Sequence, residues 1–409
     1  MRGMPSREGE RQRRLLYTAA FLRALAIGLM AVLIGLYCAR LGLGAAQIGI
    51  VLSSALWGAA FAALLTLVIG PRIPERVLLF ALCALPAAGG ALFLATDSFT
   101  IVVVAAFIAM FNVNGRDRGA IPIVEQALLA STTDDAGRTR VFAWYNVLLD
   151  SGYAVGGLLA ALPALLERAL DLSTLEAMRV SLTLFCAIYL AAALLYLRLP
   201  PRETAPVGLH QLSPASRPIV AKISVLFLID AFGGGFVGSA LLAYFFAERF
   251  GVGAATLAVL FTAGRILSAF SHLAAAWLAK RIGLVNTMLY THVPSSLLLF
   301  TIVASGDFTV AAALFLLREG LNEMDVPTRQ SYVMAVVKPD ERLAAAGITA
   351  LVRSVGWALA PMLAGVLMQS GGLGLPLIVA GATKLAYDVL LWREFRRVKP
   401  PEESVPGTV

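Results

Sequence analysis

Three adjacent charged residues, Arg116–Arg118, interrupt a stretch of apolar residues. The apolar run that begins at Thr100 reaches only Val113, about 21 Å of helix, which is too short for a hydrocarbon core of about 30 Å. We therefore predict one helix over 100–131 that carries these charges near its middle, where each costs roughly 3 kcal/mol to insert. Arginines and carboxylates at that depth suit an anionic or zwitterionic solute. The alternative is a short helix followed by a cytoplasmic loop at 112–119.

Composition places the chain in a lipid bilayer. Of its 409 residues, 59% are hydrophobic and 14% are charged, whereas soluble domains have roughly 45–50% and 25%. The formal net charge of +8 comes from Lys and Arg residues that lie mainly at the ends of apolar segments, which is a topology signal and not a nucleic-acid footprint. The three cysteines lie singly in apolar runs. We expect an integral membrane protein with no cofactor, no metal site and no nucleic-acid partner.

Twelve apolar segments are long enough to span a bilayer as helices. They predict an all-α integral membrane protein with twelve transmembrane helices in two six-helix bundles, joined by a proline-rich linker. The segments are 15–39, 47–69, 77–95, 100–131, 140–165, 177–198, 219–247, 254–278, 285–304, 309–336, 344–369 and 373–394. The predicted organisation is a basic tail at 1–14, one bundle at 15–198, the linker at 199–218, the second bundle at 219–394 and a tail at 395–409.

Basic residues set the predicted orientation. With the N-terminus inside, the tails and inside loops hold 21 Lys and Arg residues, and the outside loops hold four. The positive-inside rule therefore predicts that both termini and the linker are cytoplasmic, in a multi-pass protein of the cell membrane. The first apolar segment is too long for a secretory signal and lacks a clear cleavage site, so we expect it to be retained.

The two halves repeat one another. The segment Ala39–Ile48 returns 209 positions later within Ala247–Leu257, and Gly152–Ala161 matches Gly356–Gly365. The helix predicted at 100–131 therefore has a twin at 309–336, which also carries charges where the repeat requires membrane. The polar residues of the twin are Arg318, Glu319, Asn322, Glu323, Asp325 and Arg329.

On these features the chain resembles the major facilitator superfamily of secondary transporters, whose fold is two six-helix halves related by a pseudo-twofold axis along the membrane normal. Leu278–Gly283 is similar to the family's inside-loop motif, with Lys280 in place of its Asp. Gly152–Gly157 is similar to the exporter motif, with Gly157 in place of its Pro. The resemblance implies that the first, fourth, seventh and tenth helices line a central cavity.

The substrate and coupling site is predicted at Arg118 and Glu323, which the prolines Pro122 and Pro327 align across the pseudo-twofold axis. Each proline removes a backbone donor and is expected to kink its helix. Arg118 offers forked donors for an anionic group, and Glu323 takes up a proton if protons drive transport. The further residues of the predicted site share the same helix stripes: Asn114, Asp117, Arg318, Asn322 and Asp325.

Buried charges elsewhere are expected to pair away from lipid, either as gating contacts or as purely structural ion pairs. The predicted pairs are Arg23 with Glu125, Asp230 with Arg329, and Asp150 with Arg265 between the halves; Arg353 is a further buried charge. Lys384 and Asp388 are spaced i,i+4 and are expected to pair with each other. His272 and His292 are interpreted as solitary polar core residues rather than proton carriers.

These features predict a secondary active transporter that moves a small polar solute, anionic or zwitterionic, by alternating access. A drug–proton antiporter that works as an exporter is the alternative within the class. A membrane-embedded enzyme or a transport-dead sensor is the alternative from another class, and it would need a catalytic constellation or a large soluble domain. We expect a monomer, and the predicted partners are the solute, the lipid bilayer and the proton.

Overall fold

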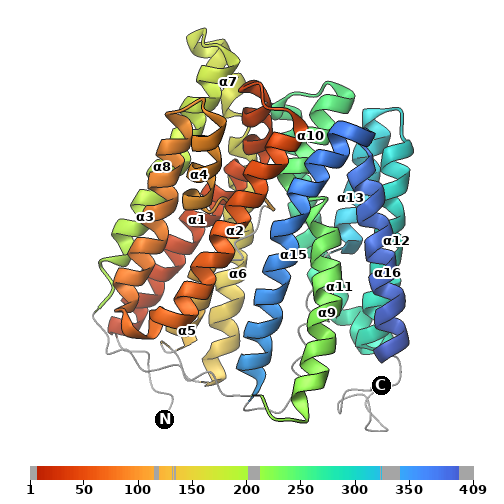
Figure 1. The fold of residues 1–409 in the computed structure, drawn as a ribbon. Helices are drawn as coiled ribbons and strands as arrows, with labels where there is room; N and C mark the ends of the chain where they lie inside the picture. The colour runs from red at the N-terminus through yellow and green to blue at the C-terminus, as the bar shows by residue number, and fades with distance from the viewer. Residues whose placement is uncertain are drawn as a thin grey trace. The chain divides into compact units, whose positions relative to one another are not determined.

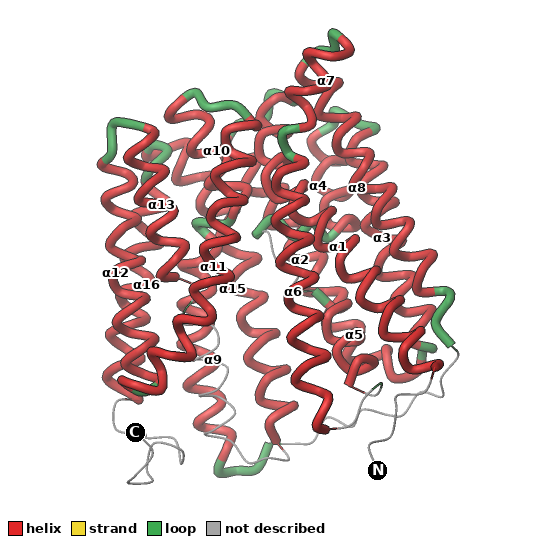
Figure 2. The backbone as a smooth tube through the Cα atoms, turned by 180° about the vertical axis from the view of Figure 1, so that it is seen from behind, coloured by secondary structure: helices red, strands yellow, loops and turns green. Residues whose placement is uncertain are grey.

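A computed structural model of the chain describes residues 7–114, 119–130, 132, 135–200, 212–322, 324 and 341–395. These residues are largely helical, and no strand occurs among them (Figures 1 and 2). Nine helices in this part of the chain are long and apolar enough to cross a membrane, and three shorter apolar helices accompany them. Each of the twelve predicted segments contains a helix, which confirms the all-α membrane fold.

Backbone contacts divide the chain into two compact units. Unit 1 consists of Met1–Val207, Ser239–Ala247 and Gly251–Thr262; unit 2 consists of Gly208–Gly238, Glu248–Phe250 and Ala263–Val409. The first eight helices are α1 (Arg7–Arg40), α2 (Ala45–Ile69), α3 (Glu75–Leu94), α4 (Phe99–Ala109), α5 (Ala120–Ala130), α6 (Asp135–Leu159), α7 (Leu162–Leu170) and α8 (Thr174–Tyr196), with a 3-10 turn η1 (Gly70–Arg72). The others are α9 (Ser216–Gly235), α10 (Ser239–Phe250), α11 (Ala254–Ile282), α12 (Leu284–Ala304), α13 (Phe308–Asn322), α15 (Arg342–Gly371) and α16 (Leu375–Phe395).

The central helix of unit 1 is α1, whose most apolar window is 83% buried. It packs most extensively against α6, because glycines on α6 let the two backbones approach closely. A Cβ on Gly156 would fall within 3.0 Å of backbone atoms of Leu25, and a Cβ on Gly152 would meet the Phe21 carbonyl at 2.7 Å. Small residues at helix interfaces are the usual means of close packing in membranes.

The same packing recurs in unit 2 between α9 and α15. A Cβ on Gly356 of α15 would lie 2.8 Å from the Leu228 carbonyl oxygen and 3.0 Å from the Phe232 nitrogen of α9. Gly152 and Gly356 are the residues that the sequence repeat matches, and each meets the first helix of its own half. The internal repeat is therefore a repeat of helix packing.

Three of the predicted helices are interrupted in the described part of the chain, those at 100–131, 140–165 and 219–247; the second is divided between α6, which ends at Leu159, and α7, which begins at Leu162. The prediction of one continuous helix over 100–131 is wrong, because α4 ends at Ala109 and α5 begins at Ala120. The segment predicted at 219–247 is likewise divided into α9 and α10 by the non-helical residues 236–238. Turn-forming residues explain the first break, since Asn112-Val-Asn-Gly115 favours a turn over helix.

Unit 2 has its own apolar core, formed where α9, α12, α15 and α16 meet. In Figures 1 and 2, α12 lies beside α16, and the two helices are in extensive contact. The buried core residues are Val220, Ile223, Leu226, Phe227, Met288, Ala345, Tyr387 and Leu391. Charged residues of α9 and α16 lie directly beside this core, as the next section describes.

Candidate functional site

The interruption between α4 and α5 lies near the middle of a membrane span. Each of these helices has 11 residues, about 16 Å at 1.5 Å per residue, or half of a hydrocarbon core of about 30 Å. Both pack against α2 and α3, and Figure 1 places α4 in the upper part of unit 1 and α5 in the lower part. The two short helices therefore act as the halves of one discontinuous transmembrane helix.

Backbone geometry and aromatic packing hold the chain after α4. Met110 ends the helix in the left-handed region, with φ 49°, a conformation that disfavours continuation. Phe111 is buried, and its ring meets those of Phe93 and Phe185 edge-on at 5.0 and 5.3 Å between centroids. The segment is thus anchored in the core of unit 1 rather than exposed to lipid.

The interruption contacts the start of α10. Within unit 1, the Ala240 amide donates to the Val113 carbonyl at 3.1 Å, and the Ser239 hydroxyl donates to the Asn114 carbonyl at 3.3 Å. Ser239 and Ala240 are the first residues of α10, directly after the break that follows α9. Non-helical backbone at membrane depth is tolerated only where protein buries it or where it lines a water-filled cavity.

Several charged residues that the sequence analysis singled out, in the predicted site or beside it, lie outside the described part of the chain. They are Arg116, Asp117, Arg118, Glu323, Asp325 and Arg329. In the sequence, Arg116–Arg118 fall between Asn114 and the start of α5. The predicted kink at Pro122 is wrong, because this proline occupies the first turn of α5, where a missing amide hydrogen leaves no helix bond unmade. A continuous helix over 100–131 would place Asn114 and Glu125 on one stripe by helical spacing, and the break shows that they do not share a helix.

Arg318 and Asn322 are brought together near the end of α13. The Arg318 side chain is buried, and its guanidinium donates to Glu319 Oε1 at 2.6 Å and to Asn322 Oδ1 at 3.3 Å. Its Nε atom, also buried, has no hydrogen-bond partner in the described part of the chain. Two of the three guanidinium nitrogens are therefore engaged, and Nε keeps its N–H without a partner among the described residues.

The ion pair predicted between Arg23 and Glu125 is present in unit 1. Both side chains are fully buried, and the Arg23 guanidinium donates to Glu125 Oε2. The phenol of Tyr145 donates to Oε2 at 2.8 Å, and that of Tyr196 donates to Oε1 at 2.5 Å. Three donors from α1, α6 and α8 thus converge on one carboxylate of α5, which satisfies it.

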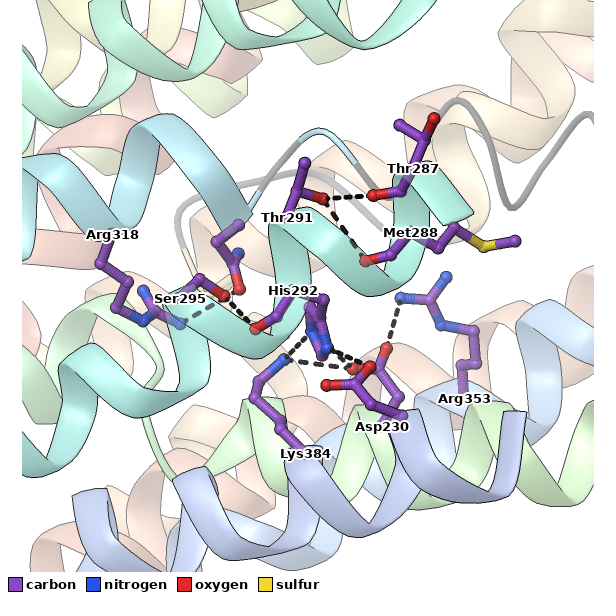
Figure 3. Close-up of polar contacts among 11 residues, drawn as sticks. Asp230, Thr287, Met288, Thr291, His292, Ser295, Arg318, Arg353 and Lys384 are labelled. Atoms are coloured by element: carbon purple, nitrogen blue, oxygen red, sulfur yellow. Dashed lines mark hydrogen bonds and ion pairs between the residues drawn. The ribbon is translucent and has the colours of Figure 1, made fainter. Parts of the chain in front are cut away.

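Asp230, on the equivalent helix of unit 2, contacts Lys384 and Arg353, and its predicted pairing with Arg329 stays a prediction. Lys384 Nζ of α16 donates to Asp230 Oδ1 at 3.1 Å, and an Arg353 guanidinium nitrogen of α15 lies 3.9 Å from Oδ2 (Figure 3). The predicted partner Arg329 lies outside the described residues. Asp230 is therefore the centre of a cluster that joins α9, α15 and α16.

His292 is not a solitary core residue, and that interpretation was wrong. Its Nδ1 lies 2.8 Å from Asp388 Oδ1, and its Nε2 lies 3.0 Å from Lys384 Nζ (Figure 3). The i,i+4 residues Lys384 and Asp388 are thus bridged by the imidazole of α12. The sequence indicates each of these residues as buried, but only the packing of α12 against α16 shows that they meet.

Asp150 of α6 and Arg265 of α11 belong to different units. Both are half-buried, and their pairing stays a prediction. Among the described residues, no group of three or more His, Cys, Asp or Glu side chains is arranged to hold a metal ion.

Comparisons with known proteins agree with the fold and with the repeat. The family model of the Major Facilitator Superfamily matches residues 16–318 and 223–408. An uncharacterized membrane protein of Saccharomyces cerevisiae, YJR124C, is 23% identical over 415 residues and is covered to 92%, as is this chain.

Solved structures of transporters share the fold at low identity. The nucleoside transporter NupG is 16% identical with a TM-score of 0.76, over 94% of this chain and 100% of NupG. A bacterial homologue of the human lysosomal transporter Spinster is 14% identical with a TM-score of 0.76, over 96% and 98%. The human organic anion transporter MFSD10 is 16% identical with a TM-score of 0.61, over 94% and 99%. The family match spans nearly the whole chain, and the protein is therefore a membrane transporter, not an enzyme, that belongs to the major facilitator superfamily.

Proposed function

We propose that this transporter moves a small anionic or zwitterionic solute by alternating access of its two halves, with protons as the coupling ion. The observation that carries this proposal is the discontinuous helix α4–α5, whose break lies at mid-depth and contacts the first residues of α10. Discontinuous helices at the membrane midplane are a recurrent device for binding polar substrates in transporters. Alternating access is the mode of transport that such a central site requires.

The charge at the break favours a negatively charged group on the solute. Arg116–Arg118 fall in the sequence between the two half-helices, and α5 directs the unpaired amides of its first turn toward the same interval. An arginine supplies two parallel donors to a carboxylate or phosphate group. In unit 2, Arg318 of α13 is a further buried guanidinium. A site of this kind is unfavourable for a purely lipophilic compound, because desolvating the charges is not compensated.

The exporter alternative has less support from the packing of its motif. Two of the glycines in Gly152–Gly157 lie against α1, where they permit close contact of the two backbones. This role explains their presence without a drug pathway.

We also retain the proposal that both termini and the linker are cytoplasmic. In that orientation, a cysteine placed at His210 is labelled only after intact cells are opened, and labelling from outside contradicts the orientation.

A solute screen tests the proposed function. We expect small anionic or zwitterionic solutes to raise the unfolding temperature of the purified protein, and the best of them to enter proteoliposomes that contain it. Arg118→Ala should abolish both effects, and Arg118→Lys should weaken them, because lysine keeps the charge but loses the fork. Arg168→Ala is the matched control, since Arg168 is exposed on α7.

Two other outcomes would contradict the proposed solute class or the proposed binding residue. Stabilisation by lipophilic cations alone would favour the exporter alternative. Unchanged stabilisation of Arg118→Ala by an anionic solute would place the binding group elsewhere.

A further inference from the structure

The buried cluster of unit 2 differs from that of unit 1 in one respect. Glu125 receives three donors, but Asp388 receives one, from His292, and its buried Oδ2 atom has no hydrogen-bond partner among the described residues. Asp388 is only 1% exposed. A buried carboxylate oxygen without a donor is costly while the carboxylate is charged. The hydrogen bonding of the unit 2 cluster is therefore incomplete while Asp388 is charged.

The hydrogen bonds of His292 fix its tautomer. The Lys384 ammonium has donors and no acceptor, so His292 Nε2, which lies 3.0 Å from Lys384 Nζ, must accept from it. The hydrogen on the ring therefore resides on Nδ1, from which it is donated to Asp388 Oδ1 at 2.8 Å. In this arrangement the imidazole is neutral.

The charges of the deeply buried groups do not balance. Asp230 and Asp388 carry two negative charges, and Lys384 carries one positive charge; each of these side chains is at most 6% exposed. Among these groups of the described chain one negative charge remains, and the more exposed Arg353, with its side chain 21% exposed, lies 3.9 Å from Asp230. A proton taken up by the buried groups adds a positive charge and therefore weakens their attraction for Arg353.

We propose that His292 and Asp388 form the proton-binding site of this transporter, and that a proton bound there releases Arg353 from Asp230. This proposal rests on the proposed proton-coupled transport and names the group that carries the proton. The proton adds to the lone pair of His292 Nε2, and the hydrogen bond from Lys384 Nζ to that atom breaks. The imidazolium then donates from Nδ1 to Asp388 and from Nε2 toward Asp230 Oδ1, which already lies 3.6 Å away.

The released Arg353 guanidinium can contact the Phe227 ring instead. Lys384 stays with Asp230 after the proton binds, so the Asp230 carboxylate then faces an additional buried cation, the imidazolium, whose charge repels that of Arg353. The Arg353 guanidinium already lies 5.8 Å from the centre of the Phe227 ring, a cation–π distance. Because Arg353 lies on α15 and Asp230 on α9, the proton would loosen the contact between these two helices.

The charged and aromatic groups that face His292 come from four helices. They surround the imidazole, and we therefore assign the proton to His292. From α16 it is contacted by Lys384, Asp388 and the Tyr387 ring, the last at 5.7 Å edge-to-face. From α9 it faces Asp230, behind which lies Arg353 of α15. On α13, which packs along α12, Arg318 is engaged with Glu319 and Asn322.

Two measurements that use protons alone test the proposal. In proteoliposomes on a solid-supported membrane, a jump in pH without solute should give a transient charge displacement as the site binds protons. His292→Gln and Asp388→Asn should abolish it. Glu394→Gln is the matched control, because Glu394 is also an acidic residue of α16 that pairs with α9, through Lys222 at 3.1 Å, but it is exposed. His272→Gln controls for loss of a histidine in a helix.

Nitrogen-15 NMR of histidine-labelled protein gives the second measurement on the unaltered chain, which has three histidines. The His292 signal should show hydrogen on Nδ1 at high pH and an imidazolium at low pH. A full charge displacement in folded His292→Gln and Asp388→Asn overturns the proposal, as does a His292 ring that never changes its protonation state. Because no solute is used, these results are independent of whether the proposed solute binds.

Discussion

Arg23 of α1 forms an ion pair with Glu125 of α5 in which neither side chain is exposed, and two phenols complete the coordination of the same carboxylate. The pair links the first helix of unit 1 to the second half of its discontinuous helix. Every oxygen of Glu125 has a donor, so the arrangement is that of a structural ion pair. Removing one member of the pair leaves the charge of the other buried, and this cost can be measured as a loss of unfolding free energy.

Arg23→Met should destabilise the protein by about 3–5 kcal/mol, because it leaves the Glu125 charge buried with phenol donors only. The double variant Arg23→Met/Glu125→Leu should recover much of this loss, since it removes both charges. Reversible unfolding in mixed micelles measures each free energy. Additive effects of the two substitutions would contradict the pairing. Tyr145→Phe should cost less, about 1–3 kcal/mol, because one neutral donor is lost.

The sequence allowed this pair and the repeat to be predicted, because both depend on simple rules. A charge in a membrane span needs a partner at the same depth, and Arg23 and Glu125 are the candidates at that depth in the first half. The match of Gly152 with Gly356 likewise predicted a shared role, which the structure shows to be close packing on α1 and on α9. Periodicity and position were enough for these features.

Gly156→Ala should destabilise unit 1 by about 1–3 kcal/mol, because the added methyl group meets backbone atoms of Leu25 that cannot rotate away. Gly347→Ala in α15 is the control, since a Cβ there has nothing within 4 Å. That control should stabilise the helix by about 0.5–1 kcal/mol. Thermal unfolding of the purified variants gives the signs. Equal effects at the two positions would mean that α1 and α6 are not in close contact.

The break in the fourth predicted helix was missed for a physical reason. A continuous helix over 100–131 is long enough to cross the hydrocarbon core. Two helices of 11 residues with an interruption between them also cross it. The turn residues before Arg116 and the first-turn position of Pro122 were the signals that could have shown it. The His292 cluster has no such signal, because residues of α9, α12 and α16 are brought together only by tertiary packing.

Substitutions at Met110 distinguish a broken helix from a continuous one. In the left-handed conformation found here, glycine should be more stable than alanine by about 1 kcal/mol, because alanine has a Cβ that this conformation disfavours. In a continuous helix, alanine should be more stable than glycine by about the same amount. The difference in unfolding free energy between Met110→Gly and Met110→Ala therefore gives the answer by its sign. Ala106→Gly inside α4 is the control and should be destabilising.

Ala240→Pro tests the contact between the α4–α5 interruption and the start of α10. Ala240 is the second residue of α10, where proline leaves the helix bonds intact but removes the amide that donates to the Val113 carbonyl. The loss of this buried hydrogen bond should destabilise unit 1 by about 1–3 kcal/mol. It should also weaken stabilisation by the solute that Arg118 binds, because the chain between α4 and α5 loses one of its attachments. Ala255→Pro is the matched control, since Ala255 is the second residue of α11 and is exposed. If both proline variants unfold and respond to solute alike, the contact at Val113 does not position the binding residues.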